Sequence, residues 1–320
     1  MRRIVLAAAG LLCAATISAS AQSYPNRPVR VIVPTPAGGP VDVMARLLAA
    51  ALPASLGQTV FVENKPGAGN TIGSRLAAAA DPDGYTLMVS AASGLIMSPM
   101  IYKISGYDAS SFAPIALIAE TPQLLVVNRN LPIKTLAELI AYAKANPGKL
   151  NYSTGGTGTL PHLAAELFKK ETGTNIVHVP YKGGGPSLMG VVAGETQMTF
   201  DTIATSGQLV ADGKLRALAV AGPKRVAKFP NVPTMTQAGY PSLATGAWTA
   251  LLAPRGTPPE IIAKLNAATN AAINSEPMKS ALVKLGAQPR GGTPQELANH
   301  MANETKKWKP IVAALDLKVE

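Results

Sequence analysis

The sequence has a single cysteine, and its position bounds the chemistry that the protein can perform. Cys13 lies within an apolar run over residues 4–17, which follows two arginines. The small residues Ala19-Ser20-Ala21 come next, in the arrangement that signal peptidases cleave. The pattern predicts a signal peptide over residues 1–21 and an exported chain that begins near Gln22. Because that chain lacks cysteine, it has no disulfide, thiolate nucleophile or thiolate metal ligand.

Acidic residues are also scarce, since 18 Asp and Glu stand against 29 Lys and Arg, for a formal net charge of +11. Two of the positive charges lie in the predicted signal peptide. The other basic residues are scattered, without interleaved aromatic side chains, which argues against nucleic acid as a partner. A diffuse positive field favours encounters with small anions. No later run is long and apolar enough to span a bilayer.

Motifs of metal-binding and catalytic sites are missing as well. The three histidines, His162, His178 and His300, do not stand at the spacing of metal ligands. The run Gly67-Ala68-Gly69-Asn70-Thr71-Ile72-Gly73 has one residue too many between its second and third glycines for a dinucleotide fingerprint, and no nucleophile elbow or Walker A sequence appears. We therefore expect no metal, no cofactor and no enzymatic activity. The alternative is an exported hydrolase or isomerase that acts on a small carboxylic acid.

Short apolar runs alternate with helical patterns along most of the chain. This order is typical of an α/β fold, and we expect parallel sheets flanked by helices. The predicted strands are Val29–Val33, Val60–Glu63, Tyr85–Ser90, Pro114–Ile118, Leu124–Val127, Leu150–Ser153, Ile176–Val179, Met198–Phe200, Leu215–Val220 and Trp248–Ala253.

Three helix starts match the capping box, in which a threonine hydroxyl and a glutamate three residues later satisfy each other's backbone N–H groups. They begin at Thr135, Thr257 and Thr293. The helices that follow have apolar residues on one face, as expected of helices that cover a sheet.

Two segments are candidates for hinges between two lobes, namely residues 118–123 and the proline-containing region 221–241. A chain that crosses twice makes one continuous and one discontinuous domain. We predict lobe 1 from residues 22–121 and 225–320, and lobe 2 from residues 122–224.

Glycine-rich turns connect a strand to a helix at three places, residues 31–40, 151–162 and 177–186. Such a turn leaves backbone N–H groups unpaired at the positive end of a helix dipole, which suits an anion. Glycines let the backbone approach a ligand, and neighbouring hydroxyls add hydrogen bonds. The alternative is a set of ordinary tight turns with capping threonines. We predict that the loops hold a carboxylate between the lobes, with the candidate ligand-binding residues Thr35, Ala37, Gly38, Gly39, Asp42, Ser93, Ser153, Thr154, Gly155, Gly156, Thr157, Gly158, Thr159, His162, Tyr181, Lys182, Gly183 and Asp201.

Several of these candidates have a structural alternative. Lys182 either faces a second carboxylate or projects into water. Asp42 either stabilises the helix after Pro40 or lies near an amine of the ligand. Asp201 either faces the cleft or caps a helix. His162, at a helix start, either lies near the ligand or bonds within the glycine-rich loop.

Seven motifs, in order along nearly all of the exported chain, carry a resemblance to the substrate-binding proteins of tripartite tricarboxylate transporters, the TctC or Bug family. They are Tyr24–Arg30, Pro36–Asp42, Val62–Gly69, Asp81–Leu87, Tyr152–Thr159, His178–Gly183 and Leu215–Val220.

The resemblance implies a type II periplasmic-binding-protein (Venus-flytrap) fold with two α/β lobes. It implies a monomer in the periplasm that takes a small carboxylate from water by lobe closure and delivers it to a membrane permease or a sensor domain. Thr35 departs from the family pattern, in which many members have a bulky aromatic residue at this point, so the identity of the ligand does not carry over.

Overall fold

The computed structural model describes residues 24–102, 106–222 and 224–315. The predicted signal peptide and Cys13 lie outside these ranges. The strands are β1 (Val29–Val33), β2 (Val60–Asn64), β3 (Thr86–Ala91), β4 (Phe112–Thr121), β5 (Gln123–Asn128), β6 (Asn151–Thr154), β7 (Val177–Pro180), β8 (Met198–Thr202), β9 (Leu215–Ala221), β10 (Ala247–Pro254) and β11 (Gln288–Gly291). All ten predicted strands are present.

The longer helices are α1 (Pro40–Ala51), α3 (Thr71–Ala78), α5 (Leu136–Ala145), α6 (Leu160–Thr172), α7 (Gly184–Ala193), α8 (Ile203–Ala211), α9 (Pro259–Asn274), α10 (Glu276–Lys284) and α11 (Pro294–Ala314). Short helical turns are α2 (Pro53–Leu56), η1 (Ala68–Asn70), η2 (Ser93–Met97), α4 (Ser98–Ile101), η3 (Ala109–Ser111) and η4 (Pro241–Leu243). None of the helices in the described part of the chain is long and apolar enough to cross a membrane.

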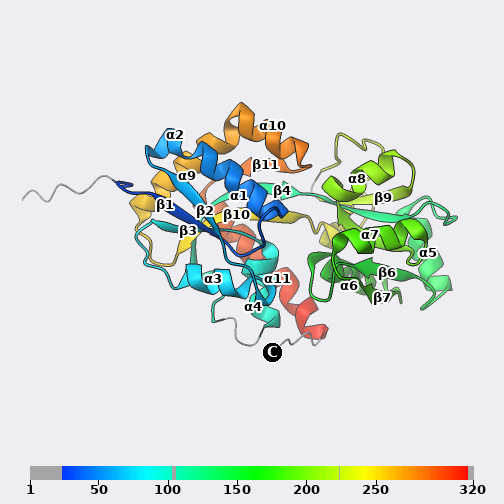
Figure 1. Cartoon of the computed structure of the whole chain (residues 1–320). Coiled ribbons are helices and arrows are strands. Elements are labelled where there is room, and N and C mark those ends of the chain that lie inside the picture. The colour runs from blue at the N-terminus through cyan, green and yellow to red at the C-terminus, as the bar shows by residue number, and fades with distance from the viewer. Residues whose placement is uncertain (1–23, 103–105, 223, 316–320) are drawn as a thin grey trace, which may run out of the picture.

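The strands form two separate sheets. One has six strands in the order β11-β4-β10-β3-β1-β2, and the other has five in the order β7-β6-β8-β5-β9. We call the part of the molecule built on the first sheet lobe 1 and the part built on the second lobe 2. Figure 1 shows the two side by side, each with helices on both faces of its sheet. The residue boundaries predicted for the lobes, at 121/122 and 224/225, stay a prediction.

Both sheets are mixed, so the expectation of parallel sheets was wrong. β1 pairs in parallel with β2 and β3, but β10 is antiparallel to both of its neighbours, β3 and β4. In lobe 2, β5 is antiparallel to β8 and β9. The reason is the double crossing: the strand that carries the chain out of a lobe lies beside the strand that brings it back, so the two run in opposite directions.

Strand β11 was missed because its sequence, Gln-Pro-Arg-Gly, lacks the β-branched and aromatic residues that mark a strand. It pairs only with β4, at the edge of the lobe 1 sheet. A proline is tolerated there because an edge strand has one side without ladder hydrogen bonds.

The capping-box prediction holds at one of three helices. Thr293 accepts the N–H of Glu296 (3.2 Å), and the Glu296 carboxylate accepts the N–H of Thr293 (2.7 Å). At α5 the hydroxyl of Thr135 accepts the expected N–H, but Glu138 bonds the N–H of the residue before Thr135. At α9 the prediction was wrong, because the N-cap is a proline and the Thr257 hydroxyl donates to a carbonyl of the preceding turn.

The crossing segments pack closely because two glycines lack a side chain. Gly246 precedes β10, and a Cβ built on it would lie 3.4 Å from the carbonyl oxygen of Thr121 and 3.5 Å from that of Ala221. Gly222 follows β9, and its Cβ would lie 3.1 Å from the Cβ of Pro122. The three segments therefore lie within contact distance of one another.

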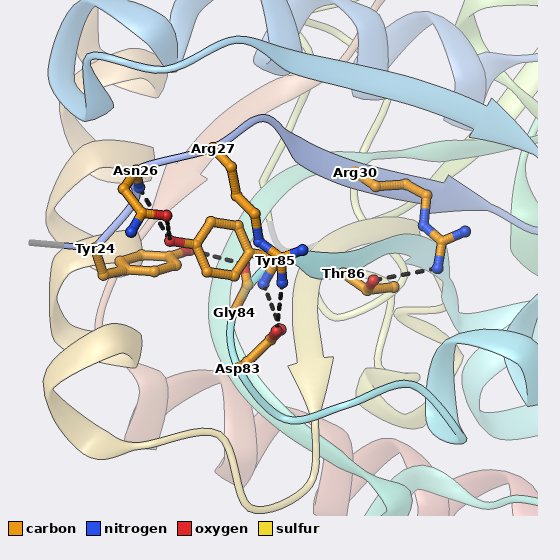
Figure 2. A network of polar contacts seen from close by, with 8 residues as sticks. All are labelled: Tyr24, Asn26, Arg27, Arg30, Asp83, Gly84, Tyr85 and Thr86. Atoms are coloured by element: carbon orange, nitrogen blue, oxygen red, sulfur yellow. Dashed lines mark hydrogen bonds and ion pairs between the residues drawn. The ribbon is translucent and has the colours of Figure 1, made fainter. Parts of the chain in front are cut away.

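Two of the sequence motifs meet at the far end of lobe 1, where β1 and β3 begin (Figure 2). Arg27 pairs with Asp83 at 2.8 Å and lies over the ring of Tyr85, 4.2 Å from its centre. The Tyr24 hydroxyl donates to the carbonyl of Gly84 (2.7 Å). These residues fasten the N-terminal segment to the turn before β3, so their role in the fold is structural.

Candidate ligand-binding site

A cavity of about 390 Å³ lies between the lobes, a volume typical of small-molecule sites. It is found at the carboxyl end of β3, where open α/β sheets usually bind ligands. Lobe 1 contributes Gly69, Asn70, Ala91, Ala92, Ser93, Ser98, Ile101, Tyr102, Ala247 and Trp248, and lobe 2 contributes Thr157, Gly158, Thr159 and Leu160.

The start of helix α6 is the polar wall of this cavity. Thr159 is the N-cap, but its hydroxyl donates to the carbonyl of Gly156 (2.7 Å). No side chain of the described residues caps the helix. Pro161 has no N–H, so the first-turn N–H groups of Leu160 and His162 are the ones left for another acceptor, at the positive end of the dipole. The hydroxyl of Thr157 makes no hydrogen bond within the described ranges and lines the same wall.

Two of the predicted hydroxyl donors serve the fold instead. Ser153 is fully buried and donates to the carbonyl of Ser187 in α7 (3.0 Å). Thr154 is also fully buried, and its Oγ1 accepts the N–H of Gly156 (3.2 Å) and lies 2.7 Å from Nε2 of His178. Neither lines the cavity, because strand β6 turns both side chains into lobe 2.

The two glycine-rich loops of lobe 2 lie against each other. A Cβ on Gly155 would lie 2.8 Å from the backbone nitrogen of Gly184, so only glycine fits. Gly156 has φ = +136°, a conformation that side chains disfavour. Gly155 and Gly156 therefore shape the loop, while the neighbouring Gly158 lines the cavity.

His162 bonds within the glycine-rich loop, as one of its two sequence interpretations had it. Its Nδ1 accepts the N–H of Gly158 (3.1 Å), and its ring stacks on His178 with centres 4.1 Å apart. Burial lowers the pKa of His162, and it lowers that of His178 to about 4, where the neighbouring imidazole adds to the effect. Both rings are thus neutral near pH 7, which the accepted hydrogen bond at Nδ1 requires.

Asp42 has a structural role in the loop before α1. Its side chain accepts hydrogen bonds from the Gly38 N–H (2.8 Å), Arg46 Nε (3.0 Å) and Asn64 Nδ2 (2.8 Å). Burial works against its charge, but these three donors together hold the pKa of Asp42 below its ordinary value. The carboxylate is already engaged, which favours loop stabilisation over contact with an amine of the ligand.

The rest of this loop lies beside the cavity without lining it. Gly73 of α3 approaches it so closely that a Cβ would lie 2.8 Å from Cα of Pro34. Thr35 is half-buried, and its Oγ1 is buried without a hydrogen-bond partner in the described part of the chain. A ligand role for Thr35, Ala37, Gly38 and Gly39 stays a prediction.

The other lobe 2 candidates do not reach the cavity. The hydroxyl of Tyr181 donates to Glu195 (2.8 Å), and its ring lies against Gly190 of α7. Lys182 is exposed and has no ion pair among the described residues, and its neighbour Gly183 has a φ of +116° at the start of α7. These positions favour the structural interpretation of Tyr181 and the solvent interpretation of Lys182.

The structure supports neither a helix cap nor a cavity-lining position for Asp201. The N-cap of α8 is Thr202, so Asp201 is not the capping residue, and its carboxylate accepts the hydroxyl of Thr205 (2.5 Å). Burial raises the pKa of Asp201 to about 6. It does not line the cavity.

Sequence reasoning named four cavity residues, Ser93, Thr157, Gly158 and Thr159, and missed the larger part of lobe 1's contribution. Asn70 was passed over because its glycine-rich run fails as a nucleotide motif. In the structure Asn70 has φ = +77°, which is unusual for a residue other than glycine. Trp248 was counted only as part of a strand. Its rarity was an available signal, since the chain has only two tryptophans.

The chain is similar to known receptors over nearly its whole length. The model of the tripartite tricarboxylate transporter family receptor, TctC, matches residues 44–317. Protein BugT of Bordetella pertussis is 38% identical, over 99% of this chain and 97% of its own. The Rhodopseudomonas palustris protein solved with adipate is 36% identical, with a TM-score of 0.76 over 91% of this chain and 97% of that one. The R. palustris protein MatC, solved with bound malate, is 34% identical, with a TM-score of 0.74 over 90% and 100%.

These findings confirm the resemblance and the fold class predicted from the sequence. The two α/β lobes are those of a periplasmic binding protein. Its relatives are solute-binding proteins, and the family implies a periplasmic location. The chain belongs to the TctC family of receptors of tripartite tricarboxylate transporters.

Proposed function

We propose that this receptor captures a small carboxylate in the cavity between its lobes and delivers it to the permease of a tripartite tricarboxylate transporter. The observation that carries the proposal is the N-terminus of α6, which no described side chain caps and which lines the cavity beside the Thr157 hydroxyl, itself without a hydrogen-bond partner among the described residues. The adipate and malate bound to the two relatives from R. palustris support the same ligand class.

The chemistry of this wall suits a carboxylate. A carboxylate that leaves water loses strong hydration, and charge-assisted hydrogen bonds of about 1.5–3 kcal/mol each offset that loss. Backbone N–H groups at a helix start supply such bonds without the side-chain entropy cost of a flexible cation. Because Thr159 directs its hydroxyl to Gly156, a ligand oxygen does not compete with a capping side chain.

Binding between the lobes also explains capture. Residues 157–160 of lobe 2 line one side of the cavity, and lobe 1 residues such as Asn70 and Trp248 line the other. A ligand that contacts both sides binds the closed arrangement better than an open one. It therefore shifts the population toward closure. A permease or a sensor domain then distinguishes the loaded receptor from the empty one by its shape.

The substitution Thr159→Asp tests the proposal while preserving the fold. Aspartate is a favourable N-cap, so it should cap α6, add a negative charge at the carboxylate position and leave the melting temperature equal or higher. Adipate and malate should bind wild type in isothermal titration and lose at least about 100-fold in affinity in the variant. Thr135→Asp, at the N-cap of the remote helix α5, is the matched control and should bind as wild type does. Unchanged binding to a folded Thr159→Asp protein would rule out this site.

A further inference from the structure

The cavity has a polar wall and a set of apolar side chains. The polar wall is the start of α6 described above. Apolar surface comes from Ile101, Tyr102 and Trp248 of lobe 1 and from Leu160, the first residue of α6, beside the polar lobe 1 residues Asn70, Ser93 and Ser98. Tyr102 and Leu160 are half-buried side chains, while Ile101 and Trp248 are buried at 5% and 2% exposure and form the floor. A ligand with a carboxylate at α6 therefore has apolar surface within reach of its remaining atoms.

The single polar group of the Trp248 side chain is already bonded and is not available to a ligand. Its Nε1 donates to Oε2 of Glu304 in α11 (3.1 Å). The same oxygen accepts Nε1 of Trp308 (2.9 Å), and Oε1 accepts Nζ of Lys307 (2.6 Å). Glu304 is 6% exposed, and with all these donors it fixes the indole from behind.

The helix that carries Glu304 is itself held in place. Lys307 also donates to the carbonyl of Ala244, in the segment that returns to lobe 1 (3.3 Å). Helix α11 packs on η2 and on α6, the elements on either side of the cavity. The Trp248 indole is thus held by Glu304, and its Nε1 is not available as a donor to a ligand.

From this arrangement we propose that the ligand is an organic acid with an apolar body, which packs among Ile101, Tyr102 and Leu160 over the Trp248 floor that Glu304 holds in position. The inference rests on the function proposed above and specifies the ligand class of the same site. Short acids with little apolar surface, such as malate, leave these apolar side chains largely without contacts.

Succinate and adipate provide the test, because they have the same two carboxylates and differ by two methylene groups. Burying both methylenes predicts about a fifteen-fold tighter Kd for adipate in isothermal titration. Adipate should also bind more tightly than malate. Succinate or malate binding as tightly as adipate would overturn the inference and leave carboxylate capture standing. If none of the three acids binds, the proposed function itself fails.

A pair of variants locates the apolar body. Leu160→Ala should reduce the preference of adipate over succinate to about three-fold or less, with little change for succinate. Leu209→Ala, on the remote helix α8 of the same lobe, should leave the preference unchanged. An undiminished preference in a folded Leu160→Ala protein would contradict the assignment.

The two tryptophans allow an independent measurement. In Trp308→Phe the only indole left is that of Trp248, so its emission reports on the floor of the cavity. Saturating adipate should change this emission more than saturating succinate does. Equal responses to the two acids would show that the methylene groups do not reach Trp248.

Discussion

His162 stacks on His178 with ring centres 4.1 Å apart, and each imidazole forms a hydrogen bond with the glycine-rich loop before α6. His162 bonds the N–H of Gly158, and His178 lies 2.7 Å from Oγ1 of Thr154. Protonation of Nδ1 in His162 would replace that acceptor by a donor. The loop that forms the polar wall of the cavity is therefore maintained by two neutral imidazoles.

Acid should destabilise the protein through this pair. The pKa values of both imidazoles are lowered, that of His178 from 6.5 to about 4, so the unfolded chain binds protons first as the pH drops. Their contribution to the free energy of unfolding is complete above pH 6.5 and is lost toward pH 4. Glu166, which favours the charged rings, and Lys169, which opposes them, also face the pair. The melting temperature of His178→Gln should fall less than that of wild type between pH 7 and pH 4. Parallel pH profiles would contradict this account.

Asp201 should show the opposite dependence on pH. Burial raises the pKa of Asp201 to about 6, so the folded chain binds a proton at a higher pH than the unfolded chain does. The charged carboxylate therefore lowers the free energy of unfolding at pH 7.5. Asp201→Asn should therefore raise the melting temperature at pH 7.5, and the gain should shrink as the pH falls through 6. The exposed Asp212→Asn, in the same lobe, should show no such gain. A loss of stability in Asp201→Asn at pH 7.5 would show that the charged form is favoured.

Substitution of Gly156 should damage both the fold and binding. Its φ of +136° is strained for any side chain, although no atom lies closer than 4.0 Å to a Cβ built on it. We expect Gly156→Val to lose about 1–3 kcal/mol of stability, measured by urea denaturation. Gly185→Ala, at an open position in the first turn of α7, is the matched control and should be neutral or slightly stabilising. Equal stability of the two variants would argue against backbone strain at Gly156.

Lys182 should contribute little to affinity. It is exposed, it does not line the cavity and it has no ion pair within the described ranges. Lys182→Ala should weaken adipate binding by less than about five-fold, the scale of an exposed ion pair. Isothermal titration at low and moderate salt would measure this. A loss of 100-fold or more would instead mean that Lys182 reaches a ligand carboxylate when the lobes close.

The strands could be predicted from the sequence because alternating and continuous apolar runs report burial directly, as in Val29–Val33 and Leu124–Val127. Their directions could not, because they depend on how the chain crosses between the lobes. β11 escaped prediction for a different reason: an edge strand with Pro289 needs neither strong propensity nor a full ladder.

The glycine-rich turn at α6 was predictable because glycine, threonine and proline in that order mark a strand-to-helix junction. Which hydroxyls face the ligand was not. Ser153 and Thr154 look like ligand donors in the sequence, but both hydroxyls are buried in hydrogen bonds within lobe 2, while that of Thr157 has no partner in the described part of the chain. The role of Trp248 depends on Glu304, which lies 56 residues away, a relationship that no local pattern contains.

The crystal structure of the complex with adipate is the most direct test of capture between the lobes. The account predicts one carboxylate within hydrogen-bond distance of the first-turn N–H groups of α6, with the rest of the ligand against Tyr102 and Trp248 of lobe 1. An adipate molecule held by one lobe alone, or bound away from Thr157, Gly158 and Thr159, would contradict it.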